Sequence, residues 1–139
     1  MAPKISVIIP LYGTFDSERV YISIDSLKNQ KNVNLEISVV EQSDSPRFLG
    51  LDGIIYIHIK PVFSSDGFLI PGLVRNIAVK NSDGDFIYNN DGDIIFRNQN
   101  YLCNLLKLME ESENICLCHP FMRRLPIENF ENFRDRFKK

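Results

Sequence analysis

The tripeptide Asp-Gly-Asp occurs at residues 83–85 and again at residues 91–93, with a short and mainly apolar segment between the copies. Two carboxylates spaced by one small residue can hold a divalent cation such as Mg2+ when a phosphate supplies other oxygen ligands. Asp-Gly between apolar stretches is also a strong hairpin signal. Each copy is therefore a candidate metal site or a simple turn, and the elements around it must decide between the two.

The rest of the chain alternates short apolar runs with helical patterns, which indicates an α/β fold with a largely parallel sheet flanked by helices. The first run is β-branched on both faces, as in a strand buried within a parallel sheet. In the third run isoleucines alternate with polar residues, which favours a place near the sheet edge. We expect strands at residues 4–13, 35–41, 54–60, 85–90 and 114–121, and helices at 16–31, 71–80, 98–111 and 128–137. No linker divides the chain, so residues 1–139 are expected to form one domain.

The two copies lie at opposite ends of the strand expected at residues 85–90. Ligands of open α/β sheets bind beyond the carboxyl ends of the strands, so residues 83–85 are predicted to be a turn and residues 91–93 a site. Other residues suited to binding should reach the same edge, namely Tyr12, Glu41 and Asn90. An aromatic face can stack on a base, a carboxylate can accept a base N–H or a ribose hydroxyl, and paired acids can bind a metal. These residues predict a metal-assisted nucleoside-diphosphate site.

Composition argues against several other classes of function. A formal net charge of −2 disfavours binding to a nucleic-acid backbone. The longest apolar run near the N-terminus is far too short to span a bilayer, and it lacks the charged flank of a signal peptide. Three cysteines without framework spacing indicate reduced thiols and a cytoplasmic location.

The sequence contains residues for other kinds of ligand site. Cys103, Cys116, Cys118 and His119 could form a Cys3His zinc site, but Cys-x-Cys within an apolar run is more typical of a strand than of a zinc knuckle. The chain has no P-loop, no G-x-G-x-x-G after the first strand, and no EF-hand spacing. A nucleotidyltransferase of similar shape would need a glycine-rich, basic loop after the first strand, whereas residues 11–18 are acidic.

Three segments in this order, ISVIIPLYG, ISVVEQSD and LVRNIAVKNSDGDFIYNNDGDIIF, resemble the N-terminal half of family 2 glycosyltransferases, which have the GT-A fold. The resemblance covers about residues 4–97. It implies a GT-A, nucleotide-diphospho-sugar transferase-like domain in which residues 93–139 form an unusually short C-terminal part. A truncated form of that fold is one alternative.

On the nucleobase side, the resemblance implies that Pro10 and Tyr12 lie against uracil. Glu41 stands where the family usually has the first Asp of an Asp-Asp pair that binds the base, and it keeps the carboxylate on a longer arm. Gln42 replaces the second acid of that pair.

On the diphosphate side, Arg75 and Asn76 match an Arg-Asn pair of the family, in which the arginine faces the nucleotide. Asp91 and Asp93 match the Asp-x-Asp (DXD) motif that binds the nucleotide-sugar and its metal, Mg2+ or Mn2+. Family members commonly follow this motif with a third Asp, and here Ile94 takes that position.

The implied function is inverting transfer of a sugar from a nucleotide-sugar, expected to be UDP-linked, to a hydroxyl of an unidentified glycan, lipid or small molecule. The metal would neutralise the leaving diphosphate. No residue can be assigned as the catalytic base from the sequence. The alternative is a non-catalytic nucleotide-binding or assembly module, or a fragment, that keeps the donor half of the fold. A stripe of Phe130, Phe133 and Phe137 would then offer a surface for self-association.

Overall fold

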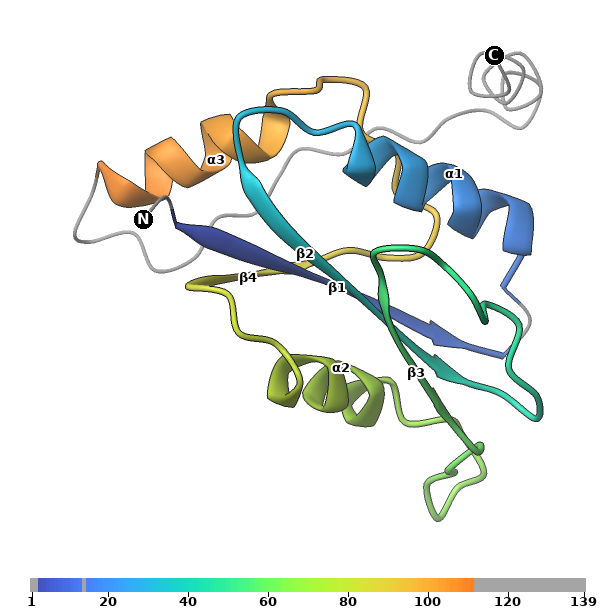
Figure 1. Cartoon of the computed structure of the whole chain (residues 1–139). Coiled ribbons are helices and arrows are strands. Elements are labelled where there is room, and N and C mark those ends of the chain that lie inside the picture. Colours follow the sequence, from blue (N-terminus) through green and yellow to red (C-terminus); the bar gives the residue numbers. More distant parts are fainter. Residues whose placement is uncertain (1–2, 14, 112–139) are drawn as a thin grey trace. The chain divides into compact units, whose positions relative to one another are not determined.

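The computed structural model describes residues 3–13 and 15–111. The elements follow in the order β1 (Lys4–Tyr12), α1 (Ser17–Lys28), β2 (Asn34–Gln42), β3 (Ile55–Ile59), α2 (Pro71–Lys80), β4 (Phe86–Asn89) and α3 (Tyr101–Glu110) (Figure 1). These are the strands and helices expected from the sequence, with ends that differ by up to three residues. The strand expected at 114–121 and the helix expected at 128–137 lie outside the described residues.

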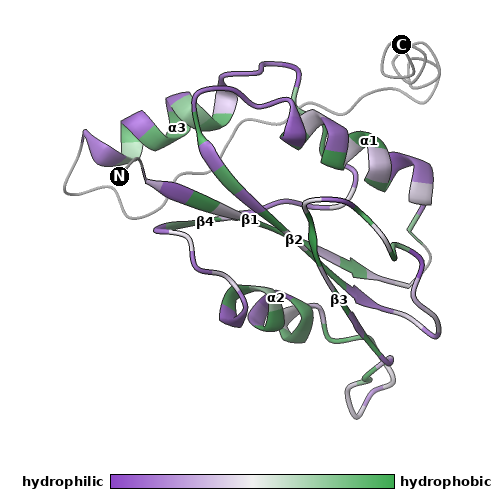
Figure 2. Cartoon of the chain, viewed as in Figure 1, coloured by the Kyte–Doolittle hydropathy of each residue, from purple (hydrophilic) through white to green (hydrophobic). Residues whose placement is uncertain are grey.

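The sheet has four strands in the order β3-β2-β1-β4, and every neighbouring pair is parallel. β1 lies between two partners, and its residues from Ile5 to Leu11 are buried. A central strand of this kind has no face turned to water, which explains why its sequence is a continuous run of mainly β-branched residues. β3 is an edge strand, as its alternating sequence predicted. Figure 2 shows hydrophobic and hydrophilic residues interleaved on the helices.

The described residues form two compact units. The sheet unit comprises residues 3–20 and 33–94 and contains the sheet and α2. In this unit α2 packs on the sheet, because Val74 and Ala78 form a buried cluster with Ile8 of β1 and Val40 of β2. Pro71 begins α2, a position that suits its fixed backbone angle.

The α3 unit comprises residues 21–32 and 95–111. The side chain of Gln30 holds the start of α3: its Oε1 accepts a hydrogen bond from Leu102 N at 3.0 Å, and its Nε2 donates to Asn98 O at 2.8 Å. The first of these bonds satisfies a backbone N–H that has no partner within the helix. Ser26 Oγ accepts from Phe96 N at 3.1 Å and ties the segment before α3 to α1.

The first Asp-Gly-Asp copy lies in the connection between α2 and β4, at the amino end of β4. Lys4 N donates to Asp85 Oδ2 at 2.8 Å, and Lys4 Nζ forms ion pairs with Asp83 and with Glu36, the latter at 3.0 Å. Hydrogen bonds to Asp83 and Glu36 raise the pKa of Lys4, and the bond from Lys4 lowers the pKa of Asp83. These contacts therefore hold the chain before β4 at the amino ends of β1 and β2.

The glycine of this copy is required by a close approach to β1. A Cβ on Gly84 would lie 2.5 Å from Ser6 Oγ and 2.6 Å from Ser6 N, well inside contact distance. Without a side chain there, Gly84 N donates to Ser6 Oγ at 2.9 Å, and Ser6 Oγ donates to Glu36 Oε1 at 2.7 Å. The residue type is therefore explained by packing and not by an unusual φ angle.

Candidate functional site

The second Asp-Gly-Asp copy follows the carboxyl end of β4, beside the last residues of β1. Asn90 N donates to Ile8 O at 2.9 Å, which aligns the end of β4 with the middle of β1. β1 therefore continues past β4, and residues 91–93 run alongside it. A Cβ on Gly92 would lie 2.5 Å from Leu11 Cδ2 and 3.4 Å from Val20 Cγ2, so only glycine fits at this approach.

Both acids of this copy are exposed, while the backbone between them is held in place. Ile94 N donates to Asp91 O at 3.1 Å and closes a turn, and the buried Asn90 donates through Nδ2 to the same oxygen at 3.0 Å. Arg75 Nη2 of α2 forms an ion pair with Asp91 Oδ1 at 3.2 Å. The guanidinium of Arg75 thus lies beside Asp91, and Asn90 and Asp93 belong to the same turn.

Glu41, the expected base contact, lies inside the protein. Its side chain is fully buried, and both carboxylate oxygens accept hydrogen bonds. Arg47 Nε donates to Oε1 at 2.5 Å, and Arg47 N and Tyr56 Oη donate to Oε2 at 3.1 and 2.5 Å. Burial alone would raise the pKa of Glu41, but the bonds from Tyr56 and Arg47 bring it below the usual range. Glu41 is therefore an ionised carboxylate whose oxygens are hydrogen-bonded to groups of the protein itself.

Arg47 connects this carboxylate to the loop after β1. Its Nη1 donates to Phe15 O at 2.9 Å and its Nη2 to Gly13 O at 3.2 Å. Sequence reasoning missed both Arg47 and Tyr56. An acid at the end of a buried strand needs a cation and hydrogen-bond donors. That requirement is the signal in the sequence from which a partner in the next loop could have been inferred.

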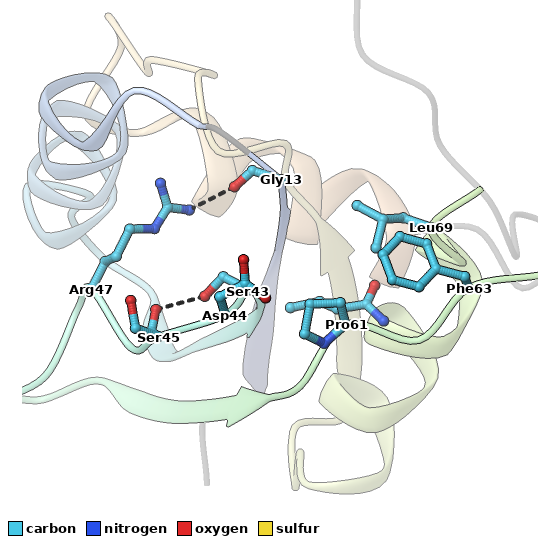
Figure 3. Close-up of a pocket in the computed structure, with 9 residues that line it drawn as sticks. Gly13, Ser43, Asp44, Ser45, Arg47, Pro61, Phe63 and Leu69 are labelled. Atoms are coloured by element: carbon cyan, nitrogen blue, oxygen red, sulfur yellow. Dashed lines mark hydrogen bonds between the residues drawn. The ribbon is translucent and has the colours of Figure 1, made fainter. Parts of the chain in front are cut away.

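A pocket of about 350 Å3 opens beside this network. Figure 3 shows Pro61, Phe63 and Leu69 on one side of it and the polar residues Ser45 and Arg47 on the other. The apolar residues come from residues 61–69, where Phe63 and Leu69 pair as an isolated antiparallel bridge and Ser64 N donates to Phe68 O at 2.7 Å. The other residues that line the pocket are Gly13, Gln42, Ser43 and Asp44.

Gln42 is the buried polar residue of this lining. Its Nε2 donates to Val62 O at 3.2 Å, which sets the orientation of the amide. Its Oε1 has no hydrogen-bond partner among the residues that the structure describes. A buried acceptor without a partner is unfavourable by about 1–3 kcal/mol, so this atom marks a place where a donor group would be stabilised.

The remaining candidates are placed as follows. Pro10 is buried within β1, where it pairs with Val40 of β2, so it lies short of the carboxyl edge. Tyr12 is half-buried at the end of β1, and its ring meets that of Phe15 edge-on with centroids 5.8 Å apart. Asn76 is exposed on α2. None of Pro10, Tyr12 and Asn76 is among the residues that line the pocket.

The zinc alternative rests mostly on residues outside the description. Cys116, Cys118 and His119 lie beyond residue 111, while Cys103 is buried in α3 as a free thiol. Within residues 3–13 and 15–111, no group of three or more His, Cys, Asp or Glu side chains is placed to hold a metal ion. No helix in the described part of the chain is both long and apolar enough to cross a membrane.

Solved structures of glycosyltransferases share this fold. Residues 1–349 of S. aureus TarS are 26% identical, with a TM-score of 0.58 over 78% of this chain and 32% of that one. The same TarS segment in complex with UDP is 22% identical, with a TM-score of 0.58 over 84% of this chain and 38% of that one. The mannosyltransferase PcManGT from Pyrobaculum calidifontis, in complex with GDP-Man and Mn2+, is 17% identical, with a TM-score of 0.61 over 78% of this chain and 33% of that one.

This chain thus spans about a third of the length of these structures. None of the curated proteins compared with it matches its sequence. The expected GT-A-like fold, an α/β fold with a parallel sheet, is confirmed by the observed topology and by these likenesses. The model of the family named "Glycosyl transferase family 2" matches residues 6–137. Because this match extends over nearly the whole sequence, the chain belongs to glycosyl transferase family 2.

Proposed function

We propose that this chain binds the donor of a glycosyl transfer, a nucleotide-sugar that is UDP-linked, together with Mg2+ or Mn2+. The sugar would pass with inversion to a hydroxyl of a glycan, lipid or small-molecule acceptor. The observation that carries the proposal is the second Asp-Gly-Asp copy, which presents two exposed acids beyond the carboxyl end of β4 with Arg75 beside them. Ligands of open parallel sheets bind at this edge.

The two acids fit a hard divalent cation. Asp91 and Asp93 are exposed, and the turn between them is held by Asn90 and by the close approach of Gly92 to Leu11. Mg2+ is commonly bound through one or two carboxylates, with phosphate oxygens and waters as the other ligands. When bound, the metal supplies charge neutralisation for the leaving diphosphate.

Arg75 could also neutralise charge on the diphosphate. Its ion pair with Asp91 is a single contact of 3.2 Å between partly exposed side chains, and such pairs contribute little to stability. The guanidinium can therefore leave Asp91 for a phosphate oxygen at little cost, and it would then add a second positive charge at the diphosphate.

The choice of UDP and of a metal is supported by the related structures. TarS has been solved in complex with UDP and with UDP-GlcNAc, and PcManGT with GDP-Man and Mn2+. In this chain the pocket at the ends of β1 and β2 offers an apolar side and polar groups, which suits a nucleobase.

The proposal is tested by isothermal titration of the full chain with UDP, in Mn2+ and in EDTA. Wild type should bind UDP in Mn2+, and the double variant D91A/D93A should lose binding. The double variant D83A/D85A is the matched control, because it removes the same two acids from the copy at the amino end of β4. This control should be less stable but should still bind UDP. Binding by wild type that is indifferent to EDTA and to D91A/D93A would refute the metal site.

The transfer step needs its own measurement, namely release of UDP from UDP-sugars with and without acceptor hydroxyl compounds. Release that depends on Asp93 supports a catalytic donor domain. Metal-dependent UDP binding without sugar transfer or donor hydrolysis supports the other function, a nucleotide-binding module that keeps the donor half of the fold.

A further inference from the structure

The outer edge of β3 is open. β3 is the last strand on one side of the sheet, and within the described residues only β2 pairs with it (Figure 1). Backbone groups of successive residues in a strand point alternately to its two sides. Ile59 O accepts a hydrogen bond from Ser43 N, which follows β2, so Ile59 faces inward. Tyr56 and His58 therefore present their N–H and C=O groups outward, where another strand could bind them.

The sequence of β3 lacks the usual protection of an edge strand. Native edge strands are commonly blunted by charged side chains, by proline or by a bulge. Residues 55–59 read IYIHI, and the first lysine and proline follow only after the strand, at Lys60 and Pro61. Of the nine large hydrophobic side chains that are exposed in the described residues, five lie around this strand, namely Leu49, Ile55, Val62, Phe63 and Phe68. Such an edge favours pairing with a further strand.

A second copy of β3 fits this edge in the antiparallel direction. When Ile57 of one copy lies opposite Ile57 of the other, Tyr56 faces His58 and Ile55 faces Ile59. The outward N–H and C=O groups of Tyr56 and His58 then form the hydrogen-bonded pairs of an antiparallel ladder. Isoleucine meets isoleucine on one face of the joined sheet, which is a favourable cross-strand pair. The register is its own mirror in sequence, so the contact is symmetric and closes as a dimer.

Charge supports the same orientation. Lys60 is exposed just after β3, and Asp52 is exposed in the turn just before it. In the antiparallel register, Lys60 of one copy lies beside the turn that contains Asp52 of the other, and the two-fold axis repeats this contact. Opposite charges therefore meet at both ends of the paired strands. The exposed Leu49 and Val62 lie near these same two ends, so apolar side chains also come together there.

We propose that the outer edge of β3 is a surface for self-association, at which two copies of this chain pair antiparallel about Ile57. The pairing joins two four-stranded sheets into one continuous sheet. It is independent of the donor site, because none of the residues of β3 lines the pocket or belongs to the turn at residues 91–93. It is also a different surface from the phenylalanine stripe at residues 130–137, which lies outside the described residues.

The first test is sedimentation of the full chain at increasing concentration. Wild type should approach twice the mass of one chain. I55K places an ammonium group against Ile59 of the other copy, and it should weaken the dimer by about tenfold or more, because the change occurs twice in each dimer. I87K is the matched control, because Ile87 is exposed on β4, the strand at the other edge of the sheet. It should leave the dimer unchanged, and circular dichroism shows whether both variants fold.

An exchange of charges tests the direction of pairing. K60E and D52K each place like charges together at both ends of the paired strands, so each should weaken the dimer by about fivefold. An equimolar mixture of K60E and D52K again brings opposite charges together at both ends, and it should associate as tightly as wild type. Lys60 and Asp52 lie at opposite ends of β3 within one chain, so recovery can arise only between copies.

Cysteine substitution tests the register. Cα atoms of a non-hydrogen-bonded antiparallel pair lie about 4.5 Å apart, which is within the range of a disulfide. I57C should therefore form a disulfide with its own counterpart when treated with oxidised glutathione. I55C should not, because residue 55 of each copy lies on opposite sides of the two-fold axis. Both variants are compared with wild type, since the chain has three cysteines of its own.

Several outcomes would overturn the proposal. These are a wild type that stays monomeric at every concentration, a dimer that I55K and I87K weaken equally, and a disulfide that forms as readily in I55C as in I57C. If I57C does not fold, the mixture of K60E and D52K decides alone, and a mixture that does not recover refutes the pairing. A monomer with slow amide exchange at Tyr56 and His58 would show that another segment of the same chain covers the edge, which also refutes self-association here.

Discussion

The buried pair of Glu41 and Arg47 gives the sharpest prediction for stability. The substitution R47M keeps most of the apolar stem of the side chain and removes the guanidinium. It leaves the fully buried carboxylate of Glu41 with Tyr56 as its remaining side-chain donor among these contacts. Removing one partner of a buried ion pair typically reduces stability by about 3–5 kcal/mol. Because the side chain of Arg47 is 27% exposed, the pair is not fully buried, and we expect a loss of about 3 kcal/mol, at the lower end of that range.

The sign of the pH dependence is a second part of the same prediction. In wild type the pKa of Glu41 is lowered, so its contribution to stability is present above its ordinary value of 4.5 and is lost as the pH falls through the folded-state value. In R47M, burial is no longer offset by the guanidinium, and the pKa should rise. Protonation then favours the folded variant, so the difference from wild type should shrink on acidification.

The assay is urea denaturation of wild type and R47M at several pH values from neutral to acidic, followed by circular dichroism. At neutral pH the thermal midpoint should also fall by about 10 °C. R97M is the matched control, because Arg97 is exposed and its substitution removes the same charge. A loss below about 0.5 kcal/mol, with a gap to wild type that does not change with pH, would show that the carboxylate is solvated and would refute this reasoning.

Three further results are expected. G84A should reduce the free energy of unfolding by about 1–3 kcal/mol in urea denaturation, because the added Cβ would lie 2.6 Å from Ser6 N; an unchanged midpoint would contradict the packing explanation. Burial and the bond to Glu41 raise the pKa of Tyr56 to about 12, so ultraviolet titration should show a late ionisation step that Y56F lacks. Its share of stability should be present below pH 10 and be lost as the pH rises through about 12, a loss that Y56F should not show. Q30A should destabilise the start of α3 by about 1 kcal/mol, seen as faster amide exchange at Leu102; unaltered exchange there would exclude the cap.

The two Asp-Gly-Asp copies show how one tripeptide serves two purposes. At the amino end of β4 its acids are bound to Lys4, and its glycine lies against Ser6. At the carboxyl end both acids are exposed; the backbone of the turn is hydrogen-bonded, and Asp91 forms a single ion pair with Arg75. The difference arises from the neighbours that the parallel sheet brings to each end and not from the tripeptide itself.

Local sequence patterns were sufficient for most of the fold. The continuous β-branched run predicted the central strand β1, the alternation from Ile55 to Ile59 predicted the edge strand β3, and Pro71 marked the start of α2. These features depend on side-chain periodicity and backbone angles, which neighbouring residues specify. The order of strands and helices then identified the sheet edge where Asp91 and Asp93 lie, because parallel strands place their carboxyl ends together.

Only the tertiary structure decided which polar groups are available for binding. Glu41 and Gln42 are adjacent in sequence, and by residue type the carboxylate is the stronger candidate for a ligand contact. The structure shows Glu41 engaged by Arg47 and by Tyr56 from the next strand, while Gln42 lines the pocket with one acceptor unpartnered among the described residues. The need of a buried charge for partners can be inferred from sequence, but the identity of those partners depends on loop paths and long-range contacts that no local pattern specifies.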